Sequence, residues 1–284
     1  MEINLNNITF IIVSFKSENV IYNCIDSLPK QSKKIIIENS KNIKLKKDLE
    51  LKYDNIEVVM NDNTGMGASN NLGISMSNTE FVYILNPDTK FTTNTFKNLI
   101  ETSKTLNDFA ILSPICSDKN LPNYKIFQND GKNKNDILEV DTIDGFSMLI
   151  NKSKFNGNYF DENFFLYLEN DDLCLRTKKN DHKIYIIKNA TIDHLGASSS
   201  EFNNINDFEY LRNWHWMWSK FYFNKKHHGF LFSIFKIFPN FISSVLKFIF
   251  YILLFNFHKK NIYKMRILGL FNSILGKKSF FRPD

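Results

Sequence analysis

The sequence predicts an α/β fold in which a mainly parallel sheet is flanked by helices and followed by a basic, aromatic-rich helical extension. Two observations lead to this prediction. Short continuous apolar runs alternate with helix-compatible segments through the first 90 residues, as in parallel strands that helices cover on both faces. After residue 204 the composition changes, and basic and aromatic residues become frequent. We therefore expect an α/β domain at residues 1–204 and a helical, membrane-associating region at residues 205–284.

The predicted elements follow one another along the chain. Strands are expected where apolar, β-branched residues run together, at Ile8–Ser14, Lys34–Glu38, Ile56–Met60 and Phe81–Leu85. Helices are expected between them, at Val20–Leu28 and Ala68–Ser77. Two further buried strands are expected at Ile143–Ile150 and Lys183–Ile187.

The stretch FLYLENDDLCLR, Phe165–Arg176, predicts a helix that begins near Asn170. Asn is a strong helix N-cap, and Asp171 and Asp172 would then lie in the first turn, where the helix dipole favours negative charge. This explanation leaves Glu169, just before the cap, without a structural reason for its position.

The composition is that of a globular protein, with 43% hydrophobic and 23% charged residues among 284. Cys24, Cys116 and Cys174 lie far apart and show no CxxC or CxxH spacing. Neither a disulfide framework nor a zinc knuckle is therefore expected, and a reducing cytoplasm fits best. Glu2 and the short apolar run after it are unlike a signal peptide, which has a basic start.

The basic charge belongs to the C-terminal region. Residues 205–284 carry 13 Lys and Arg against 3 Asp and Glu, a net charge of +10, whereas residues 1–204 carry a net charge of −4. In the segment from Phe230 to Phe257 only Lys236 and Lys247 are charged. This segment is long enough for a membrane span, but Pro239 interrupts it. We expect helices that lie in the membrane interface, where the flanking lysines and arginines favour anionic headgroups. A transmembrane span and a buried helical cap or dimer surface are the alternatives.

The segment RNWHWMWSKFYF, Arg212–Phe223, interleaves basic and aromatic residues. This pattern is found where single-stranded nucleic acid stacks on a protein, and equally in interfacial Trp and Tyr belts. Because an apolar stretch follows directly, we favour membrane docking and expect no nucleic-acid partner.

Polar residues follow each predicted strand of the first 90 residues, at the sheet edge where open parallel sheets bind ligands. Ser14 ends the first run, and the motifs ENS (Glu38–Ser40), NDNTGMG (Asn61–Gly67) and NPD (Asn86–Asp88) follow the others. In NPD, Asp88 offers the oxygen ligand that a divalent cation carried by a diphosphate would need. A purely structural Asx–Pro turn is the alternative interpretation.

Two further motifs suit a divalent cation and a diphosphate. His194 follows a predicted strand, and a neutral imidazole can complete an Mn²⁺ or Mg²⁺ site with a carboxylate and phosphate oxygens. Gly65 and Gly67 lead into a helix whose N-terminus suits an anion, although the third glycine, Gly73, lies too far along for a dinucleotide fingerprint. A structural histidine and simple helix capping are the respective alternatives.

Together, in this order, the motifs resemble the inverting family 2 glycosyltransferases of the Rossmann-like GT-A fold, in particular the rhamnosyltransferase-like branch that builds bacterial surface polysaccharides. The resemblance covers roughly residues 8–200. It rests on VSFKS, ENS, Asn63–Gly73, LNPD, Asp144–Ile150, Phe160–Arg176 and His194–Ser198, and extends more loosely to GLFNSILGKKSFFRP near the C-terminus.

The resemblance implies a divalent cation, Mn²⁺ or Mg²⁺, at one end of the site. Asp88 matches the metal-binding carboxylate of the family's DxD-type motif, and Asn86 stands in place of that motif's first Asp. His194 resembles the histidine that contributes to the metal–diphosphate site.

The resemblance also implies a nucleotide-sugar donor. Ser14, Glu38 and Asn63 fall where the family holds the base and ribose, and Gly65 and Asn71 fall where it approaches the phosphates. Glu38 replaces a more frequent Asp, which leaves the choice between a UDP-sugar and a dTDP-sugar open.

The reaction implied is a single displacement at the anomeric carbon, in which a base takes the proton of the acceptor hydroxyl. The family usually has Glu–Asp where this chain has Glu169–Asn170, and that Asp is the usual candidate base. Since Asn cannot act as a base, the role would fall to Glu169 or to Asp172.

We therefore expect a metal-dependent hexosyltransferase that moves a sugar, with L-rhamnose in first place, to a lipid-linked or surface-glycan acceptor such as O-antigen, capsule or lipooligosaccharide. Its expected location is peripheral, at the cytoplasmic face of the cytoplasmic membrane. A catalytically silent glycan-assembly subunit and a nucleotidyltransferase are the competing hypotheses.

Overall fold

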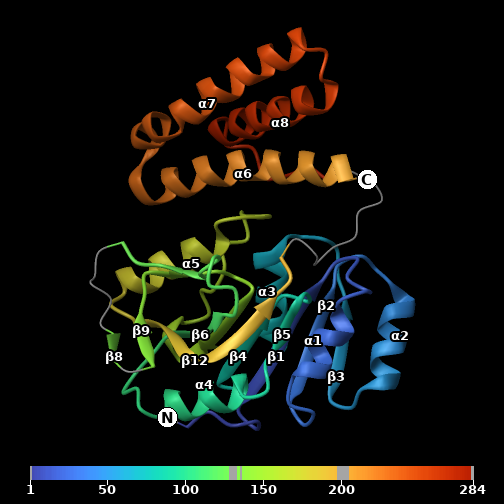
Figure 1. The fold of residues 1–284 in the computed structure, drawn as a ribbon, viewed down its shortest axis with the longest axis vertical. Helices are drawn as coiled ribbons and strands as arrows, with labels where there is room; N and C mark the ends of the chain where they lie inside the picture. The colour runs from blue at the N-terminus through green and yellow to red at the C-terminus, as the bar shows by residue number, and fades with distance from the viewer. Residues whose placement is uncertain (1, 128–132, 135, 197–204, 283–284) are drawn as a thin grey trace. The chain divides into compact units, whose positions relative to one another are not determined.

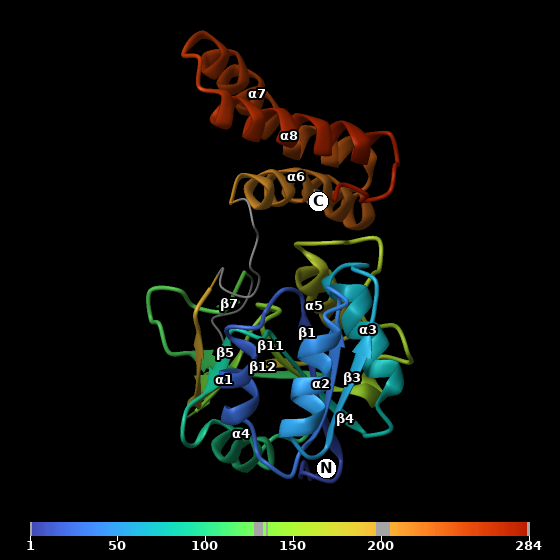
Figure 2. The ribbon, with the colours of Figure 1, turned by 90° about the vertical axis from the view of Figure 1, so that its right-hand side faces the viewer.

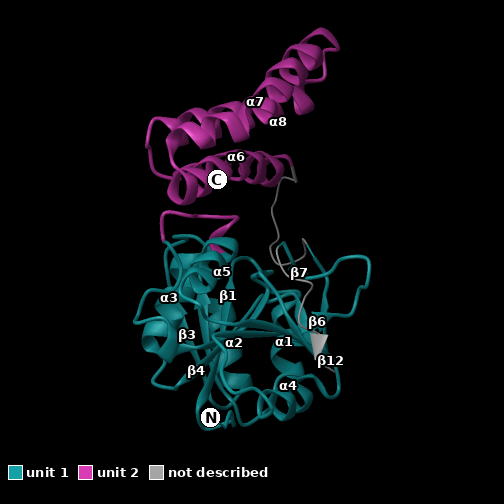
Figure 3. Cartoon of the chain, turned by 90° about the vertical axis from the view of Figure 1, so that its left-hand side faces the viewer, with its two compact units in different colours: residues 1–161, 170–201 teal, residues 162–169, 202–284 magenta. Residues whose placement is uncertain are grey.

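The computed structural model describes residues 2–127, 133, 134, 136–196 and 205–282, and divides the chain into two compact units. Residues 1–161 and 170–201 form the sheet unit, and residues 162–169 and 202–284 form the helical unit (Figure 3). The predicted boundary after residue 204 did not anticipate that an internal segment, residues 162–169, belongs with the C-terminal helices.

The sheet unit contains a large mixed sheet whose first four strands in spatial order are parallel. The order of its strands is β3-β2-β1-β4-β11-β6-β12-β9-β8, and β5 pairs with β12. The expected strands β1 (Ile8–Ser14), β2 (Lys33–Glu38), β3 (Ile56–Met60) and β4 (Phe81–Leu85) are parallel neighbours, so their carboxyl ends meet at one edge. The sheet continues through β11 (Ser147–Asn151), β6 (Ile111–Cys116) and β12 (Ile184–His194).

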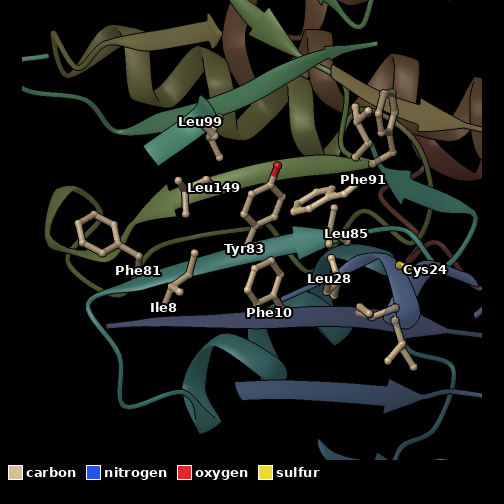
Figure 4. Close-up of a cluster of buried hydrophobic side chains, with 14 of the residues drawn as sticks. Ile8, Phe10, Cys24, Leu28, Phe81, Tyr83, Leu85, Phe91, Leu99 and Leu149 are labelled. Carbon is tan, nitrogen blue, oxygen red and sulfur yellow. The ribbon is translucent and has the colours of Figure 1, made fainter. Parts of the chain in front are cut away.

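Burial explains why β1 and β4 are mostly apolar, because helices cover the sheet (Figure 1), whereas the edge strand β3 is only partly buried. The helices are α1 (Ile21–Ser27), α2 (Ile43–Lys52), α3 (Met66–Met76), α4 (Thr95–Ser103) and α5 (Glu169–Lys179), with a 3₁₀ turn at Lys152–Lys154. The core between them includes Phe10, whose ring lies 5.3 Å from that of Tyr83 in a stacked pair, and Phe91, which meets Tyr83 edge-on (Figure 4). Cys24 is part of this core, and all three cysteines are free and buried.

The structure corrects two of the predicted strands. The run Ile143–Ile150 is broken into β10 (Thr142–Ile143), which pairs with β7 (Tyr124–Lys125), and the antiparallel strand β11. The strand expected at Lys183–Ile187 continues to His194, because a register shift between Ile187 and Thr191 lets β12 go on pairing with β6. The remaining short strands are β5 (Thr89–Phe91), β8 (Asn133–Lys134) and β9 (Ile137–Glu139).

The helical unit consists of α6 (Ile205–His228), α7 (Phe230–Leu253), α8 (Phe257–Ile274) and the segment 162–169 (Figure 2). Met217, Phe221, Ile237 and Leu270 form its core. Helix α8 crosses α6 closely at Gly269, where an added Cβ atom would lie 2.1 Å from the carbonyl oxygen of Trp214. Within the described residues, α7 is the one helix long and apolar enough to cross a membrane, judged by length and composition.

Candidate active site

Asp88 is held by a tight turn at the carboxyl end of β4. The N–H of Asn86 donates to the carbonyl oxygen of Phe146 at 2.9 Å, and the carbonyl of Asn86 accepts from the N–H and the hydroxyl of Thr89 at 3.2 and 2.7 Å. Asp88 itself is 2% exposed, and neither of its carboxylate oxygens has a hydrogen-bond partner among the described residues. A buried carboxylate without donors is costly unless a cation or a ligand completes it.

His194 lies beside Asp88 because β5 and β12 pair. The register places His194 opposite Thr89, and the Nε2 atom of His194 is 3.5 Å from Oδ1 of Asp88. The imidazole is stacked on Phe146 with ring centroids 4.0 Å apart, and the N–H of Leu195 donates to the carbonyl of Asp88 at 3.1 Å. His194 is thus the last residue of a strand, where the sequence predicted a position beyond it; Ser198 of the same motif lies outside the described residues.

The carboxyl ends of β1 and β2 bring Ser14 and Glu38 together. The two are register partners, and both side chains are fully buried. Oε1 of Glu38 accepts from the N–H of Ser40 at 2.7 Å and from the Ser40 hydroxyl, which fixes the loop that leads into α2. Oε2 of Glu38 and the hydroxyl of Ser14 have no hydrogen-bond partner among the described residues. One oxygen of Glu38 is therefore structural, and the other is available to a ligand.

A buried polar network next to this pair escaped the sequence analysis. The amide of Asn39 donates to the hydroxyl of Ser69 at 2.8 Å and accepts from the amide of Asn61 at 2.9 Å. These residues tie the ends of β2 and β3 to the first turns of α3. All three lie in motifs already named, ENS, NDNTGMG and Asn63–Gly73, but the pairing of Asn39 with Ser69 across 30 residues of chain is a tertiary contact that spacing does not reveal.

The first turn of α3 is open to an anion. Gly65 is its N-cap with φ of 107°, a conformation that favours glycine, and no side chain caps the free N–H groups. Asn63 is half-buried in the preceding loop. Asn71 has a structural task, because its amide donates to the carbonyl of Phe160 at 2.9 Å and accepts from the N–H of Phe160 at 3.0 Å.

Helix α5 corrects the prediction for Asn170. The helix begins at Glu169, and the amide of Asn170 donates to the carbonyl of Ile143 at 2.9 Å instead of capping the helix. Asp172 is fully buried, and one of its carboxylate oxygens is 2.9 Å from Nε of Arg176. Arg176 also donates to the carbonyls of residues 158 and 159. Asp172 is therefore part of an ion pair that fixes the loop before α5.

Asp144 opens the motif Asp144–Ile150, but the sequence alone assigned it no role. It lies in the break between β10 and β11, and its N–H donates to the carbonyl of Asn123 at 2.9 Å. Burial raises the pKa of this carboxyl and the carboxylate of Asp171 raises it further, while Lys125 and His194 act in the opposite sense. The sequence motif that begins with Asp144 does not reveal that Lys125, Asp171 and His194 lie near this carboxyl.

Glu169 belongs to the helical unit, one residue before the chain re-enters the sheet unit. Its side chain is 8% exposed. The two residues before it, Tyr167 and Leu168, have φ of 72° and 68°, in the left-handed region that residues with a Cβ atom rarely adopt.

A family model described as glycosyl transferase family 2 matches residues 9–174. The low-salt glycan biosynthesis hexosyltransferase of Haloferax volcanii is 26% identical over 200 residues, an alignment that covers 63% of this chain and 64% of the relative. The chain thus spans slightly less than two thirds of that relative's length.

Solved structures with similar folds share little sequence with the chain. A crystal structure of GalNAc-T7 with UDP, GalNAc and Mn²⁺ has a TM-score of 0.56 at 11% identity, covering 83% of this chain and 57% of that one. A crystal structure of S. aureus TarS 1–349 has a TM-score of 0.53 at 12% identity, covering 98% and 93%. At these identities the likeness concerns the fold alone. The predicted fold class, a mainly parallel sheet flanked by helices as in GT-A proteins with an apolar C-terminal helix, is confirmed.

Proposed function

Because the chain belongs to the family 2 glycosyltransferases, we propose that it transfers a hexose from a nucleotide-sugar donor to a glycan or lipid-linked acceptor. The observation that supports this most is the buried Asp88 carboxylate, which has no hydrogen-bond donor among the described residues and lies beside His194 at the end of the parallel sheet. Glycan biosynthesis appears in the name of the Haloferax relative, which agrees with an acceptor of this class.

A divalent cation, Mn²⁺ or Mg²⁺, fits this pair of residues. Asp88 supplies a hard oxygen ligand and His194 an imidazole nitrogen, a combination that suits Mn²⁺ in particular. The described residues contain no cluster of three or more His, Cys, Asp or Glu that could hold a metal alone, so the diphosphate of the donor would have to complete the site. When bound, the cation would neutralise the charge of the departing nucleoside diphosphate. The GalNAc-T7 structure contains both UDP and Mn²⁺.

The donor would lie along the carboxyl edge of β1, β2 and β4. Ser14, Glu38 and Asn63 would hold the base and ribose, and the spare Oε2 of Glu38 would accept an N–H of the base. Uracil and thymine present the same ring N–H, so this contact serves a UDP-sugar and a dTDP-sugar alike. The backbone after Gly65 and the amide of Asn86 would face the phosphates, while Asn71 would act by holding the Phe160 loop. L-rhamnose remains our proposal for the sugar.

We assign the role of base to Glu169, in a reaction that inverts the anomeric carbon. Asp172 is the weaker candidate because its carboxylate is paired with Arg176, which would have to be displaced before it could take a proton. Glu169 would remove the proton of the acceptor hydroxyl as that oxygen attacks, a contribution worth about 10²- to 10⁴-fold.

The test is a screen of UDP- and dTDP-sugars for Mn²⁺-dependent release of nucleotide, followed by Asp88→Asn. We expect this variant to lose metal-dependent turnover while keeping its fold, and the matched control Asp48→Asn, an exposed carboxylate on α2, to keep full turnover. Turnover of Asp88→Asn at the wild-type rate would refute the metal assignment. Donor binding without any turnover of the native chain would favour a silent assembly subunit, and release of pyrophosphate a nucleotidyltransferase.

The helical unit would place the enzyme at the cytoplasmic face of a membrane. The apolar face of α7 is open, with Phe235 78% exposed, and residues 230–274 contain no acidic side chain. Lys247 and Lys259 lie 5.4 and 5.3 Å from the rings of Tyr263 and Tyr251, which are stacked on each other. Lysines beside tyrosines at an apolar surface are typical of the interface with anionic lipids.

A groove of about 420 Å³ between α7 and α8 supports the same location. It is lined by apolar side chains and two lysines: Phe248, Tyr251, Ile252, Phe255, Phe257, Lys260 and Lys264. We expect the protein to sediment with phosphatidylglycerol vesicles and much less with phosphatidylcholine vesicles. Phe235→Asp should weaken this binding, whereas Leu51→Asp, at an equally exposed apolar position on α2, should not. Equal binding of all three proteins, or none to anionic vesicles, would contradict the membrane proposal.

A further inference from the structure

Residues Phe164–Leu168, here called the strap, directly precede Glu169 and pack on α6 of their own unit. The ring of Phe164 is fully buried and meets Tyr222 edge-on at 4.9 Å. Phe165 is 6% exposed and lies 4.6 Å from the ring of His215. The strap is therefore held by two buried rings that pack on side chains of α6.

Polar contacts fix the second half of the strap. The hydroxyl of Ser219 donates to the carbonyl of Leu166 at 2.8 Å. Nε of Arg212 donates to the hydroxyl of Tyr167 at 2.7 Å, and the Tyr167 ring meets Trp216 edge-on at 5.6 Å. The α6 residues in contact with the strap recur every three or four positions, which puts them on one face of the helix: Arg212, His215, Trp216, Ser219 and Tyr222. The strap therefore packs along one face of α6.

The segment Ser279–Arg282 also contacts α6 and the strap. It belongs to the motif GLFNSILGKKSFFRP, which has no role in the proposed donor site. Nε2 of His215 donates to the carbonyl of Phe281 at 2.8 Å, which leaves Nδ1 to accept from the hydroxyl of Ser279 at 2.8 Å. The imidazole is thus neutral and held at both nitrogens. The guanidinium of Arg282 lies 3.1 Å from the centre of the Phe165 ring, so the C-terminal segment touches the strap directly.

The backbone of the strap needs this support. Tyr167 and Leu168 are both left-handed, and consecutive left-handed residues with Cβ atoms persist only where their surroundings hold them. The contacts of Ser219 and Arg212 fall at Leu166 and Tyr167, immediately before and within this pair. Release of those contacts would let the peptide before Glu169 relax to an ordinary conformation and move its carboxylate.

We propose that α6 and Ser279–Arg282 set the position of the Glu169 carboxylate through the strap, so that the helical unit is part of the catalytic apparatus as well as a membrane contact. Ser219, Arg212 and Arg282 are positioning residues in this scheme. The inference rests on the proposed role of Glu169 as the base. It extends that role to side chains that lie outside the matched family region.

The first experiment measures kcat and the donor KM of Ser219→Ala and Tyr167→Phe. Each change removes one hydrogen bond at small steric cost, and we expect kcat to fall about tenfold while the donor KM stays within about twofold. Ser244→Ala is the matched control, because Ser244 is also buried and donates to a helix carbonyl in the same unit, at 2.7 Å in α7, without touching the strap. A loss of kcat in the control as large as in Ser219→Ala would overturn the inference.

The second experiment separates positioning from loss of fold. In a Glu169→Gln background, Ser219→Ala should have no further effect on kcat, because the group that it positions is gone. An undiminished tenfold effect there would overturn the inference. Hydrogen exchange of residues 164–169 should be faster in Ser219→Ala than in Ser244→Ala; unchanged exchange together with unchanged kcat would refute the strap and leave the proposed transferase function standing. Full activity of Glu169→Gln would refute the base assignment and the strap's role with it.

Discussion

Gly269→Ala tests whether the close crossing of α6 and α8 holds the helical unit together. The added methyl group would lie 2.1 Å from the carbonyl oxygen of Trp214, more than 1 Å short of the 3.4 Å at which ordinary contact begins, and 2.9 Å from its carbonyl carbon. Both atoms belong to the backbone of a helix, so no side-chain rotation relieves the clash. The helices must separate, and Leu270 and Phe221 of the core separate with them.

Two opposing effects set the size of the change. Overpacking of a core costs about 1–3 kcal/mol, and a clash with backbone belongs at the upper end. Alanine is the better helix former by about 1 kcal/mol, which offsets part of that cost. We therefore expect a net loss of about 2 kcal/mol in the free energy of unfolding of the helical unit. With a urea m value of about 1–2 kcal/mol per molar, the midpoint would fall by about 1–2 M.

Tryptophan fluorescence is a suitable assay because the chain's 3 tryptophans, Trp214, Trp216 and Trp218, all lie in α6. The urea transition followed by fluorescence thus reports on the helical unit. Gly276→Ala is the control, since its Cβ would meet nothing within 4 Å and only the left-handed φ of 70° opposes it, at a cost of about 1 kcal/mol. A midpoint for Gly269→Ala that equals or exceeds that of the native chain would refute the argument.

Three further predictions concern single side chains. Asn170→Asp, which restores the residue usual in the family, should lower the stability of the sheet unit by about 1–3 kcal/mol in urea unfolding, because a carboxylate would face the carbonyl of Ile143. Burial lowers the pKa of His215 to about 3. The unfolded chain, but not the folded one, then takes up a proton below about pH 6.5, so fluorescence-detected stability should fall by about 1.4 kcal/mol per pH unit from there downward, and less steeply in His215→Asn. Burial raises the pKa of Cys24 and Cys174 to about 12, so both should resist iodoacetamide at pH 8 until urea unfolds the chain.

The sequence was sufficient to predict the strands of the parallel half-sheet, because each contains a run of apolar residues, many of them β-branched, fully buried in β1 and β4 and partly buried in the edge strand β3. The bounds of β1, β3 and β4 agree with the prediction to the residue. The antiparallel part was harder to predict. The register shift that carries β12 on to His194 arises from pairing with β6, a partner about 75 residues earlier, and no local pattern announces it.

In the candidate site, too, the residues could be recognised from local sequence motifs, whereas their tertiary contacts could not. The NPD motif and His194 were recognised from residue type and order, and β5–β12 pairing brings them together. Asn170 was misjudged because its partner, the carbonyl of Ile143, is 27 residues away, whereas a capping argument considers only the nearest turn. The placement of Glu169 with the C-terminal helices likewise depends on contacts that lie far away in the sequence.

The strap has a consequence for the order in which the protein is made. Its residues leave the ribosome about 110 residues before Arg282, which at 5–20 residues per second is a delay of roughly 5–20 s. Until α6 and then Ser279–Arg282 have been made, Phe164 and Phe165 lack the side chains that contact them in the folded helical unit. We therefore expect these two phenylalanines to stay exposed in the nascent chain until the helical unit folds.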